Sequence, residues 1–345
     1  MKQKKVLMIG LTPPLEGGSE RHIYEIANRL NCDVLTEYGS SCKNVVEIPI
    51  LGTGYLKNFS FLLSSFVYAL ILLLNPRRKY DTIHIHENLL YLLIPLLSMR
   101  YKVVVTIHGI KGFKFYDNEK IWVVFRWFLK FANVIIAVNL EDKKVLDKIF
   151  KKVVYIPNGV DLSIYGKTKQ KVENKIGFIG RVHKQKGIVY LLDAFEKIKA
   201  KHPGLMLEII GKVDEYGLEL KKKYNDNRII WRGFMENRSE IAKTLKSSYL
   251  IALPSLWEGL PLVLFEALAS GRPVIVSDIP AYRSVIKDEA LFCKVKNSDD
   301  LAKKIELLLK SKETALRYGK KGMILAEKYD WKEIAKKLEG EYNKI

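Results

Sequence analysis

The chain has 345 residues, of which 48% are hydrophobic, and its formal net charge is +20. This length exceeds what one hydrophobic core usually organises, so we expect two domains. Its three cysteines, Cys32, Cys42 and Cys293, are odd in number and widely spaced, which argues against a disulfide framework and a Cys/His zinc site and favours a reducing cytoplasm.

The basic charge indicates an anionic partner, for which nucleic acid, a membrane surface and a phosphorylated substrate are candidates. The sequence carries no RNA-recognition or helix-turn-helix signature, so nucleic acid is not an expected partner. The basic N-terminus precedes a short apolar run, which predicts a first buried strand rather than a signal peptide.

Short apolar runs alternate with longer helical patterns, which is typical of βαβ units and parallel sheets, so the predicted fold class is α/β. We expect strands at residues 6–10, 82–86, 103–108 and 134–138 in the first half, and at 176–179, 207–211, 229–231, 250–253 and 273–276 in the second. Predicted helices include residues 20–30, 189–200 and 301–309. Residues 151–171, with a Pro-Asn-Gly turn at Asn158, look like the joint, and Asp330 precedes a last helix that begins at Trp331.

Gly17 and Gly18 stand between the first expected strand and the first helix. Glycines let a ligand approach the backbone, and a helix N-terminus favours an anion, although two glycines also suit an ordinary turn. No Gly-x-Gly-x-x-Gly or Walker loop follows a strand, so dinucleotide-binding and ATP-binding folds lose support.

Residues 58–76 carry no charge and are long enough to span a bilayer. Ser60, Ser64 and Tyr68, however, form a polar stripe at four-residue spacing, which suits a packed amphipathic helix. The next apolar run, residues 82–86, has to rejoin the first sheet as a central strand. We therefore predict a crossover helix rather than a membrane span.

His108 ends an expected strand, and ligand sites in parallel sheets lie beyond the carboxyl ends of the strands. We therefore expect His108 near a substrate, although a lone histidine is more often structural. His84 and His86 alternate along the preceding strand, which directs His86 toward the ligand and His84 into the core or to the surface.

Residues 111–131 mix basic and aromatic side chains on one amphipathic helix. This composition suits a membrane surface, and packing against the first-domain core explains it equally well. The basic residues are Lys114, Lys120, Arg126 and Lys130, and the aromatic ones are Phe113, Phe115, Trp122, Phe125, Trp127 and Phe128.

Arg181 follows a strand in the pair Gly180-Arg181, and Lys186 precedes a helix in the pair Lys186-Gly187. Two cations at a strand's carboxyl end can neutralise a diphosphate, although in so basic a chain they can also be surface cations. Since no two aspartates are spaced Asp-x-Asp, we expect no metal held by that motif. The cations would then stabilise a departing phosphate.

Glu258 and Glu266 enclose seven residues, with Pro261 suited to the first turn of a helix. The turn before that helix would present backbone amides to a phosphate. Because carboxylates would repel a diphosphate, we expect each glutamate to accept hydrogen bonds from sugar hydroxyls, one from a hexose and one from a ribose. The residues of this turn are Gly259, Leu260, Leu262 and Val263.

Together these segments resemble the retaining group 1 glycosyltransferases, a family 4-like group with the GT-B fold. The resemblance also uses residues 157–161 and the Trp331 helix, and covers nearly the whole chain in the expected order. It implies two Rossmann-like parallel-sheet domains facing a central cleft. Residues 1–162 would bind the acceptor, residues 163–329 would bind the nucleotide-sugar donor, and a C-terminal helix at 330–345 would cross back to the first domain.

The resemblance further implies metal-independent hexosyl transfer, with retention, from a UDP- or GDP-sugar to a glycan or lipid-linked acceptor, without a cofactor. It assigns catalysis to His108, Arg181, Lys186 and Glu258. The donor would be bound by Gly17, Gly18, Gly211, Phe234, Met235, the residues 259, 260, 262 and 263, and Glu266. A nucleotide-sugar epimerase of the same fold, and a non-enzymatic protein that binds anionic membranes or nucleic acid, are the alternatives. The expected location is the cytoplasm, with peripheral binding to the cytoplasmic membrane face.

Overall fold

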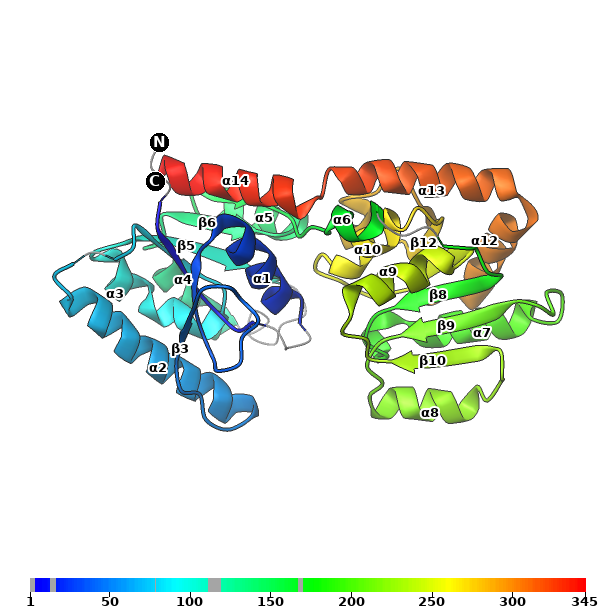
Figure 1. Ribbon diagram of the computed structural model, residues 1–345, viewed down its shortest axis with the longest axis horizontal. Helices are drawn as coiled ribbons and strands as arrows, with labels where there is room; N and C mark the ends of the chain where they lie inside the picture. The colour runs from blue at the N-terminus through cyan, green and yellow to red at the C-terminus, as the bar shows by residue number, and fades with distance from the viewer. Residues whose placement is uncertain (1–3, 13–16, 78, 111–118, 167–169) are drawn as a thin grey trace. The chain divides into compact units, whose positions relative to one another are not determined.

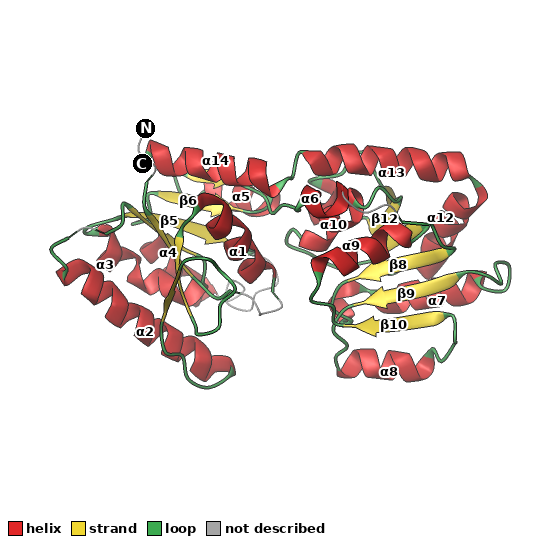
Figure 2. Cartoon of the chain, viewed as in Figure 1, coloured by secondary structure: helices red, strands yellow, loops and turns green. Residues whose placement is uncertain are grey.

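The computed structural model describes residues 4–12, 17–77, 79–110, 119–166 and 170–345. The chain divides into two compact units. Unit 1 comprises Met1–Asn158 with Trp331–Ile345, and unit 2 comprises Gly159–Asp330. Each unit is a parallel sheet flanked by helices (Figures 1 and 2), which confirms the predicted α/β class.

Within the described residues, the sheet of unit 1 has the order β3-β2-β1-β4-β5-β6-β7. Its strands are β1 (Val6–Ile9), β2 (Asp33–Thr36), β3 (Val45–Glu47), β4 (Thr82–Ile85), β5 (Lys102–Ile107), β6 (Val134–Ala137) and β7 (Val153–Tyr155). Its helices are α1 (Gly18–Leu30), α2 (Gly54–Leu74), η1 (Asn88–Leu93), α3 (Ile94–Ser98), α4 (Glu119–Leu129), α5 (Leu140–Asp147) and α14 (Trp331–Lys344). The expected strands are present, and the sheet also contains β2, β3 and β7, which were not predicted.

Helix α2 connects β3 to β4 of the same parallel sheet, so the predicted crossover helix is confirmed. It buries Phe61 and Leu72 against η1 and α3. The predicted polar stripe has a structural role, because the hydroxyls of Ser60 and Ser64 donate to the carbonyls of Leu51 and Pro49. Among the described residues, α2 is also the helix whose length and composition would suit a membrane span.

The central strands β1, β4 and β6 of unit 1 are buried on both faces. Leu7 and Ile9 pack into a core with Phe61 of α2 and Phe125 of α4. On the other face of the sheet, Nδ1 of His84 lies within hydrogen-bond distance, 2.6 Å, of the hydroxyl of Tyr342 in α14. Helix α14 also packs against α1, so the C-terminal helix returns to unit 1 as expected.

Within the described residues, the sheet of unit 2 has the order β10-β9-β8-β11-β12-β13. Its strands are β8 (Lys175–Ile179), β9 (Met206–Ile210), β10 (Ile229–Gly233), β11 (Leu250–Leu253), β12 (Val274–Ser277) and β13 (Leu291–Cys293). Its helices are α6 (Leu162–Gly166), η2 (Lys184–Lys186), α7 (Ile188–Ile198), α8 (Glu215–Lys223), α9 (Arg238–Ser247), α10 (Leu262–Ala269), α11 (Pro280–Arg283), α12 (Ser298–Lys310) and α13 (Lys312–Glu327). Cores lie on both faces, one with α7 and α12 and the other with α9, α10 and α13.

The order of strands in unit 2 reverses at β8. From β8 the chain moves through β9 to the edge strand β10, and then crosses back to place β11 on the other side of β8. The loops that follow β8 and β11 therefore leave the sheet in opposite directions. In open parallel sheets, ligands bind in the crevice at this point, outside the carboxyl ends of the strands.

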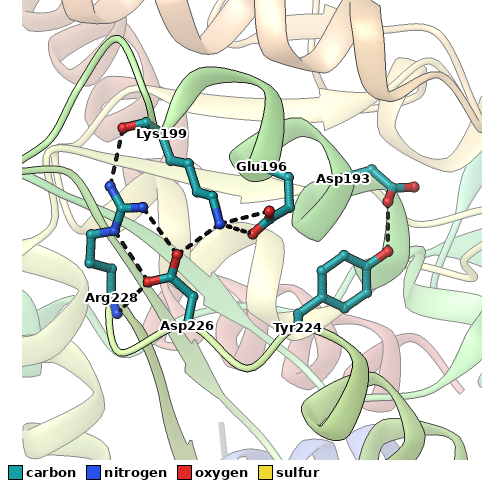
Figure 3. Close-up of polar contacts among 6 residues, drawn as sticks. All are labelled: Asp193, Glu196, Lys199, Tyr224, Asp226 and Arg228. Carbon is teal, nitrogen blue, oxygen red and sulfur yellow. Dashed lines mark hydrogen bonds and ion pairs between the residues drawn. The ribbon is translucent and has the colours of Figure 1, made fainter.

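A cluster of polar side chains lies at the amino end of β10, at the end of the sheet opposite to the crevice (Figure 3). Asp226, just before β10, accepts hydrogen bonds from Lys199 Nζ at 2.8 Å and from Arg228 Nη2 at 3.0 Å, and these two bonds lower its pKa. The hydroxyl of Tyr224 donates to Asp193 of α7 at 2.6 Å. These bonds tie the C-terminal end of α7 to the start of β10, away from the crevice.

Candidate functional site

A buried ion pair lies at the crevice of unit 2. Lys186, in the turn after β8, places its Nζ 2.5 Å from Oε1 of Glu258, in the loop after β11. Their side chains are only 12% and 5% exposed. The hydroxyl of Ser255 donates to the same carboxylate oxygen at 2.7 Å, and the Gln185 amide lies 3.5 Å from the other oxygen. The structure thus brings together two residues that the sequence reading assigned separately to a diphosphate and a sugar.

The backbone holds these two loops against each other. The amide of Leu256 donates to the carbonyl of Gln185 at 2.8 Å. Gly187 has a φ of +61°, and a Cβ there would lie 2.0 Å from the carbonyl oxygen of Pro254. Glycine at position 187 is therefore required for the close approach that forms the ion pair.

Close packing of the backbone also explains why residue 211 is a glycine. A Cβ at this position, directly after β9, would lie 1.9 Å from the carbonyl oxygen of Gly180. The loops after β8 and β9 therefore pack together only because residue 211 lacks a side chain. This packing accounts for Gly211 without a base, so the structure gives its predicted contact with a nucleotide base no separate support.

Arg181 differs from Lys186 in its surroundings. It follows Gly180 at the end of β8, and its side chain is exposed. Among the residues that the structure describes, its guanidinium forms no ion pair with a carboxylate. An exposed guanidinium at the carboxyl end of a central strand is well placed to bind an anion.

Glu266 lies in α10 and is buried, with one carboxylate oxygen engaged and the other without a partner. Its Oε1 accepts a hydrogen bond from Nη1 of Arg238 at 2.7 Å. Its Oε2 is buried and has no hydrogen-bond partner among the described residues. A buried carboxylate oxygen left without a donor is costly, which makes this atom a candidate acceptor for a ligand hydroxyl.

The sequence reading missed Arg238. It is the first residue of α9, directly after the cap residue Asn237. A cation at this position opposes the helix dipole, which favours anions at N-termini. That unfavourable placement was the available signal that Arg238 serves a specific carboxylate partner.

The turn before α10 differs from the prediction in one respect. Pro261 is the N-cap residue with extended backbone (φ −72°, ψ 133°), so the helix begins at Leu262 and Pro261 lies outside the first turn. Leu260 is buried and Val263 is partly buried, both in the core of unit 2. Their side chains thus anchor the turn, which leaves the backbone of residues 259–263 as the part that can face a ligand.

The loop after β10 contains the two residues predicted near a nucleotide base. Phe234 is half exposed, whereas Met235 packs against the unit 2 core. They follow Gly233, whose φ of +71° turns the chain toward α9. Of the two, Phe234 has the side chain available for contact.

In unit 1, Gly17 is the N-cap residue of α1 and Gly18 its first residue. A Cβ on Gly17 would lie 1.8 Å from Oε2 of Glu20, so the carboxylate of Glu20 lies over this helix start. Burial and the charge of Glu20 raise the pKa of nearby Glu87 to about 7. These carboxylates disfavour the anion that we expected at Gly17-Gly18, and they suit a ligand with hydroxyl groups instead.

His108 lies in a group of four histidines of unit 1. Its Nε2 is 3.2 Å from Nδ1 of His86, and its ring meets that of His22 edge to face at 5.1 Å between centroids. Burial lowers the pKa of all four histidines, that of His22 to about 4. His84, bonded to Tyr342 and to Thr106, is a core residue.

The side chain of Asn158 contacts the first helix of unit 1. Its Oδ1 lies 2.9 Å from Nδ1 of His22 in α1. This contact could not be predicted from the sequence, because 136 residues separate the two side chains.

The stretch 111–131 is only partly described, and the side chains of Phe113, Lys114, Phe115 and Lys120 lie outside the described residues. The rest of α4 buries Phe125 and Leu129 in the core and exposes Val123, Val124 and Trp127. The helix therefore packs on unit 1 with one face and presents apolar side chains with the other. Within the described part of the chain, no group of three or more His, Cys, Asp or Glu side chains could hold a metal ion.

Comparison with known proteins identifies the family. The family model described as "Glycosyl transferases group 1" matches residues 164–324, and "Glycosyltransferase Family 4" matches residues 16–164. The Escherichia coli UDP-Gal:alpha-D-GlcNAc-diphosphoundecaprenol alpha-1,3-galactosyltransferase is 29% identical over 74% of this chain and 71% of its own length. The phosphatidyl-myo-inositol mannosyltransferase of Mycobacterium leprae is 25% identical over 98% of this chain and 97% of its own.

Solved structures share the fold over the whole chain. The Anabaena protein HepE, in complex with UDP and glucose, superimposes with a TM-score of 0.82 at 18% identity, over 99% of this chain and 100% of that one. Sucrose-phosphate synthase from Thermosynechococcus elongatus gives 0.80 at 20% identity, over 99% and 98%. The predicted GT-B fold is confirmed. With two family models that together match residues 16–324, these similarities show that the chain belongs to the group 1 glycosyltransferases.

Proposed function

We propose that this protein transfers a hexosyl unit, with retention of configuration, from a UDP- or GDP-sugar to a glycan or lipid-linked acceptor. The observation that carries the proposal is the Lys186–Glu258 pair at the strand-order reversal, with Arg181 beside it. Ligands bind at this point in parallel sheets, and the cations suit a diphosphate. The relatives named as a galactosyltransferase and a mannosyltransferase support hexosyl transfer to a lipid-linked acceptor.

The proposed roles in unit 2 follow from the contacts. Arg181 and Lys186 bind the diphosphate, with Lys186 shared between the phosphate and Glu258. Glu258 accepts hydrogen bonds from the sugar, and the unpartnered Oε2 of Glu266 accepts them from the ribose. Backbone amides at 259, 260, 262 and 263 face the donor, and Phe234 contacts the base, while Gly211 and Met235 shape the loops beside it.

The proposed roles in unit 1 concern the acceptor. We assign His108 to that side of the reaction. We move Gly17 and Gly18 there from donor binding, because the carboxylates of Glu20 and Glu87 suit hydroxyl groups better than a diphosphate. Because burial lowers the pKa of His108, its imidazole is neutral and can accept a hydrogen bond from a sugar hydroxyl. The departing phosphate then helps to remove the proton of the acceptor hydroxyl on the same face, which accounts for retention.

We also propose that the reaction needs neither a metal ion nor another cofactor. The two cations Arg181 and Lys186 would offset the charge that develops on the leaving diphosphate, which is the role a divalent ion would otherwise fill. The proposed location is the cytoplasmic face of an anionic membrane, where a basic protein and a lipid-linked acceptor would meet.

A thermal-shift screen against UDP-, GDP- and ADP-sugars in the presence of EDTA tests the donor site. A donor at a hundredfold excess over its Kd should stabilise the protein by about 2.7 kcal/mol. We expect a UDP- or GDP-sugar to raise the melting temperature with the chelator present. No shift from any nucleotide sugar would contradict the proposal, and a shift restored only by magnesium or manganese would contradict metal independence. Sugar epimerisation without an acceptor would instead favour an epimerase.

Arg238→Gln should weaken donor binding by about 1–3 kcal/mol, the usual cost of losing a hydrogen bond to a charged group. The reason is that Arg238 holds Oε1 of Glu266 and so orients the other oxygen. We expect a raised KM for the nucleotide sugar with little change in kcat, and partial recovery in Arg238→Lys. Arg232→Gln is the matched control, because Arg232 pairs with Glu208 and not with Glu266. An unchanged donor KM in Arg238→Gln would contradict this role.

A further inference from the structure

Helix α2 presents an apolar face to solvent along its whole length. We call this face the outer face of α2, and six exposed residues form it. Their spacing of three or four residues places them on one side of a helix. They are between 50% and 95% exposed. The residues are Tyr55, Phe59, Leu63, Val67, Ile71 and Leu74.

The opposite face of α2 is firmly attached to unit 1. Phe61 and Leu72 are buried in the core, and the helix packs on η1 and α3. At its C-terminal end, the Arg100 guanidinium donates to the carbonyl of Leu73 at 2.7 Å, and the Tyr101 hydroxyl donates to that of Leu72 at 2.9 Å. Helix α2 lies at the margin of unit 1 (Figure 1), and these contacts fix it there. A helix held in this way cannot also cross a bilayer.

The charged residues within and next to α2 along the sequence are all basic. Residues 48–80 contain no aspartate or glutamate, and their charged residues are Lys57, Arg77, Arg78 and Lys79. Lys57 pairs with Glu37 near the start of the helix, and Lys79 pairs with Asp33 beyond its end. Arg77, just after the helix, is exposed. An apolar helix face with the exposed Arg77 at its end, on a chain of net charge +20, matches an anionic bilayer, whose headgroups attract cations while the apolar side chains enter the acyl boundary.

A second copy of this chain fits the outer face less well. Each copy carries a net charge of +20, so association would bring two strongly basic molecules together. Monomeric proteins seldom leave so long an apolar stripe uncovered, which calls for an occupant. The exposed Val123, Val124 and Trp127 of α4, which also packs on η1, add apolar surface on a neighbouring helix of the same unit.

We propose that the outer face of α2 lies in the plane of an anionic membrane and is the main contact of unit 1 with the bilayer. This inference extends the membrane location in the proposed function by naming the surface, and it moves the contact from residues 111–131 to α2. The helix lies on the membrane and does not span it, with Arg77 at the level of the headgroups.

Vesicle flotation tests this surface. The full chain is mixed with phosphatidylcholine vesicles with or without phosphatidylglycerol, at low and high salt. The variant Leu63→Gln/Ile71→Gln/Leu74→Gln removes apolar area from the outer face while keeping good helix formers. We expect it to weaken binding to anionic vesicles by about tenfold or more. The matched control is Leu218→Gln/Leu307→Gln/Leu316→Gln, which changes exposed leucines of three unit 2 helices and should bind as the unmodified chain does.

Three results would overturn the inference. The first is that the unmodified chain does not float with anionic vesicles at low salt. The second is that the α2 variant binds these vesicles as well as the unmodified chain does. The third is that light scattering shows dimers of the unmodified chain and of the control but not of the α2 variant. Donor thermal shifts on the same proteins separate this inference from the proposed function. A chain that binds a nucleotide sugar but no vesicles refutes the membrane surface alone, and one that binds vesicles but no donor refutes the transferase proposal alone.

Discussion

Replacing Arg181 or Lys186 by alanine is expected to reduce kcat/KM by about 2–4 kcal/mol of transition-state stabilisation, the scale of a lost contact to a developing anion. Both cations follow β8 at the point where the strand order reverses. If they offset the charge on a departing diphosphate, each loss acts mainly on the transition state and so on kcat. Steady-state kinetics with the donor identified by the thermal-shift screen measures the effect.

The two variants should differ in stability. Arg181 is exposed, so Arg181→Ala should unfold like the unmodified protein. Lys186→Ala leaves the carboxylate of Glu258 buried without its cation, and breaking such a pair costs about 3–5 kcal/mol when fully buried. Lys184→Ala, two residues away and exposed, is the control that should keep both activity and stability. Near-normal turnover in both Arg181→Ala and Lys186→Ala would refute the diphosphate assignment.

Acid should destabilise unit 1 between pH 6.5 and pH 4. His22, His84, His86 and His108 are neutral in the folded protein, because burial lowers each pKa below the ordinary value of 6.5. The unfolded chain therefore binds more protons than the folded chain as the pH falls below 6.5. Stability is fully present above pH 6.5 and is lost as the pH falls, and for His22 the loss is complete near its folded pKa of about 4.

The size of this loss is substantial. One pKa unit corresponds to about 1.4 kcal/mol, so a histidine shifted as far as His22 contributes about 3 kcal/mol. Urea unfolding of the full chain at a series of pH values measures this loss of stability. His86→Gln removes one buried imidazole and should flatten the dependence, whereas His202→Gln, outside the group, should leave it unchanged. A flat profile from pH 7 to pH 4 in the unmodified protein would show that these histidines titrate normally.

The sequence by itself determined the class of the fold. Apolar runs such as those at β1, β5 and β11 are continuous because strands of parallel sheets are buried on both faces, and this makes them visible without a structure. The same reading missed β3, which pairs at the sheet edge with two of its three residues exposed, and β13, which has three residues. Such strands form because a neighbouring strand offers hydrogen bonds, and that information is not local.

The sequence also identified the loops of the candidate site, since cations, glycines and carboxylates that follow central strands gather at one edge of a sheet. Only the tertiary structure decided which of them meet. Lys186 contacts Glu258 because β8 and β11 are neighbours in the sheet, although 72 residues separate the two side chains. Arg238 reaches Glu266 because α9 and α10 cover the same face of that sheet. Whether the apolar stretch 58–76 is core or surface was equally undecided by composition, because the packing on η1 and α3 selects which face of α2 is buried and which is left to solvent.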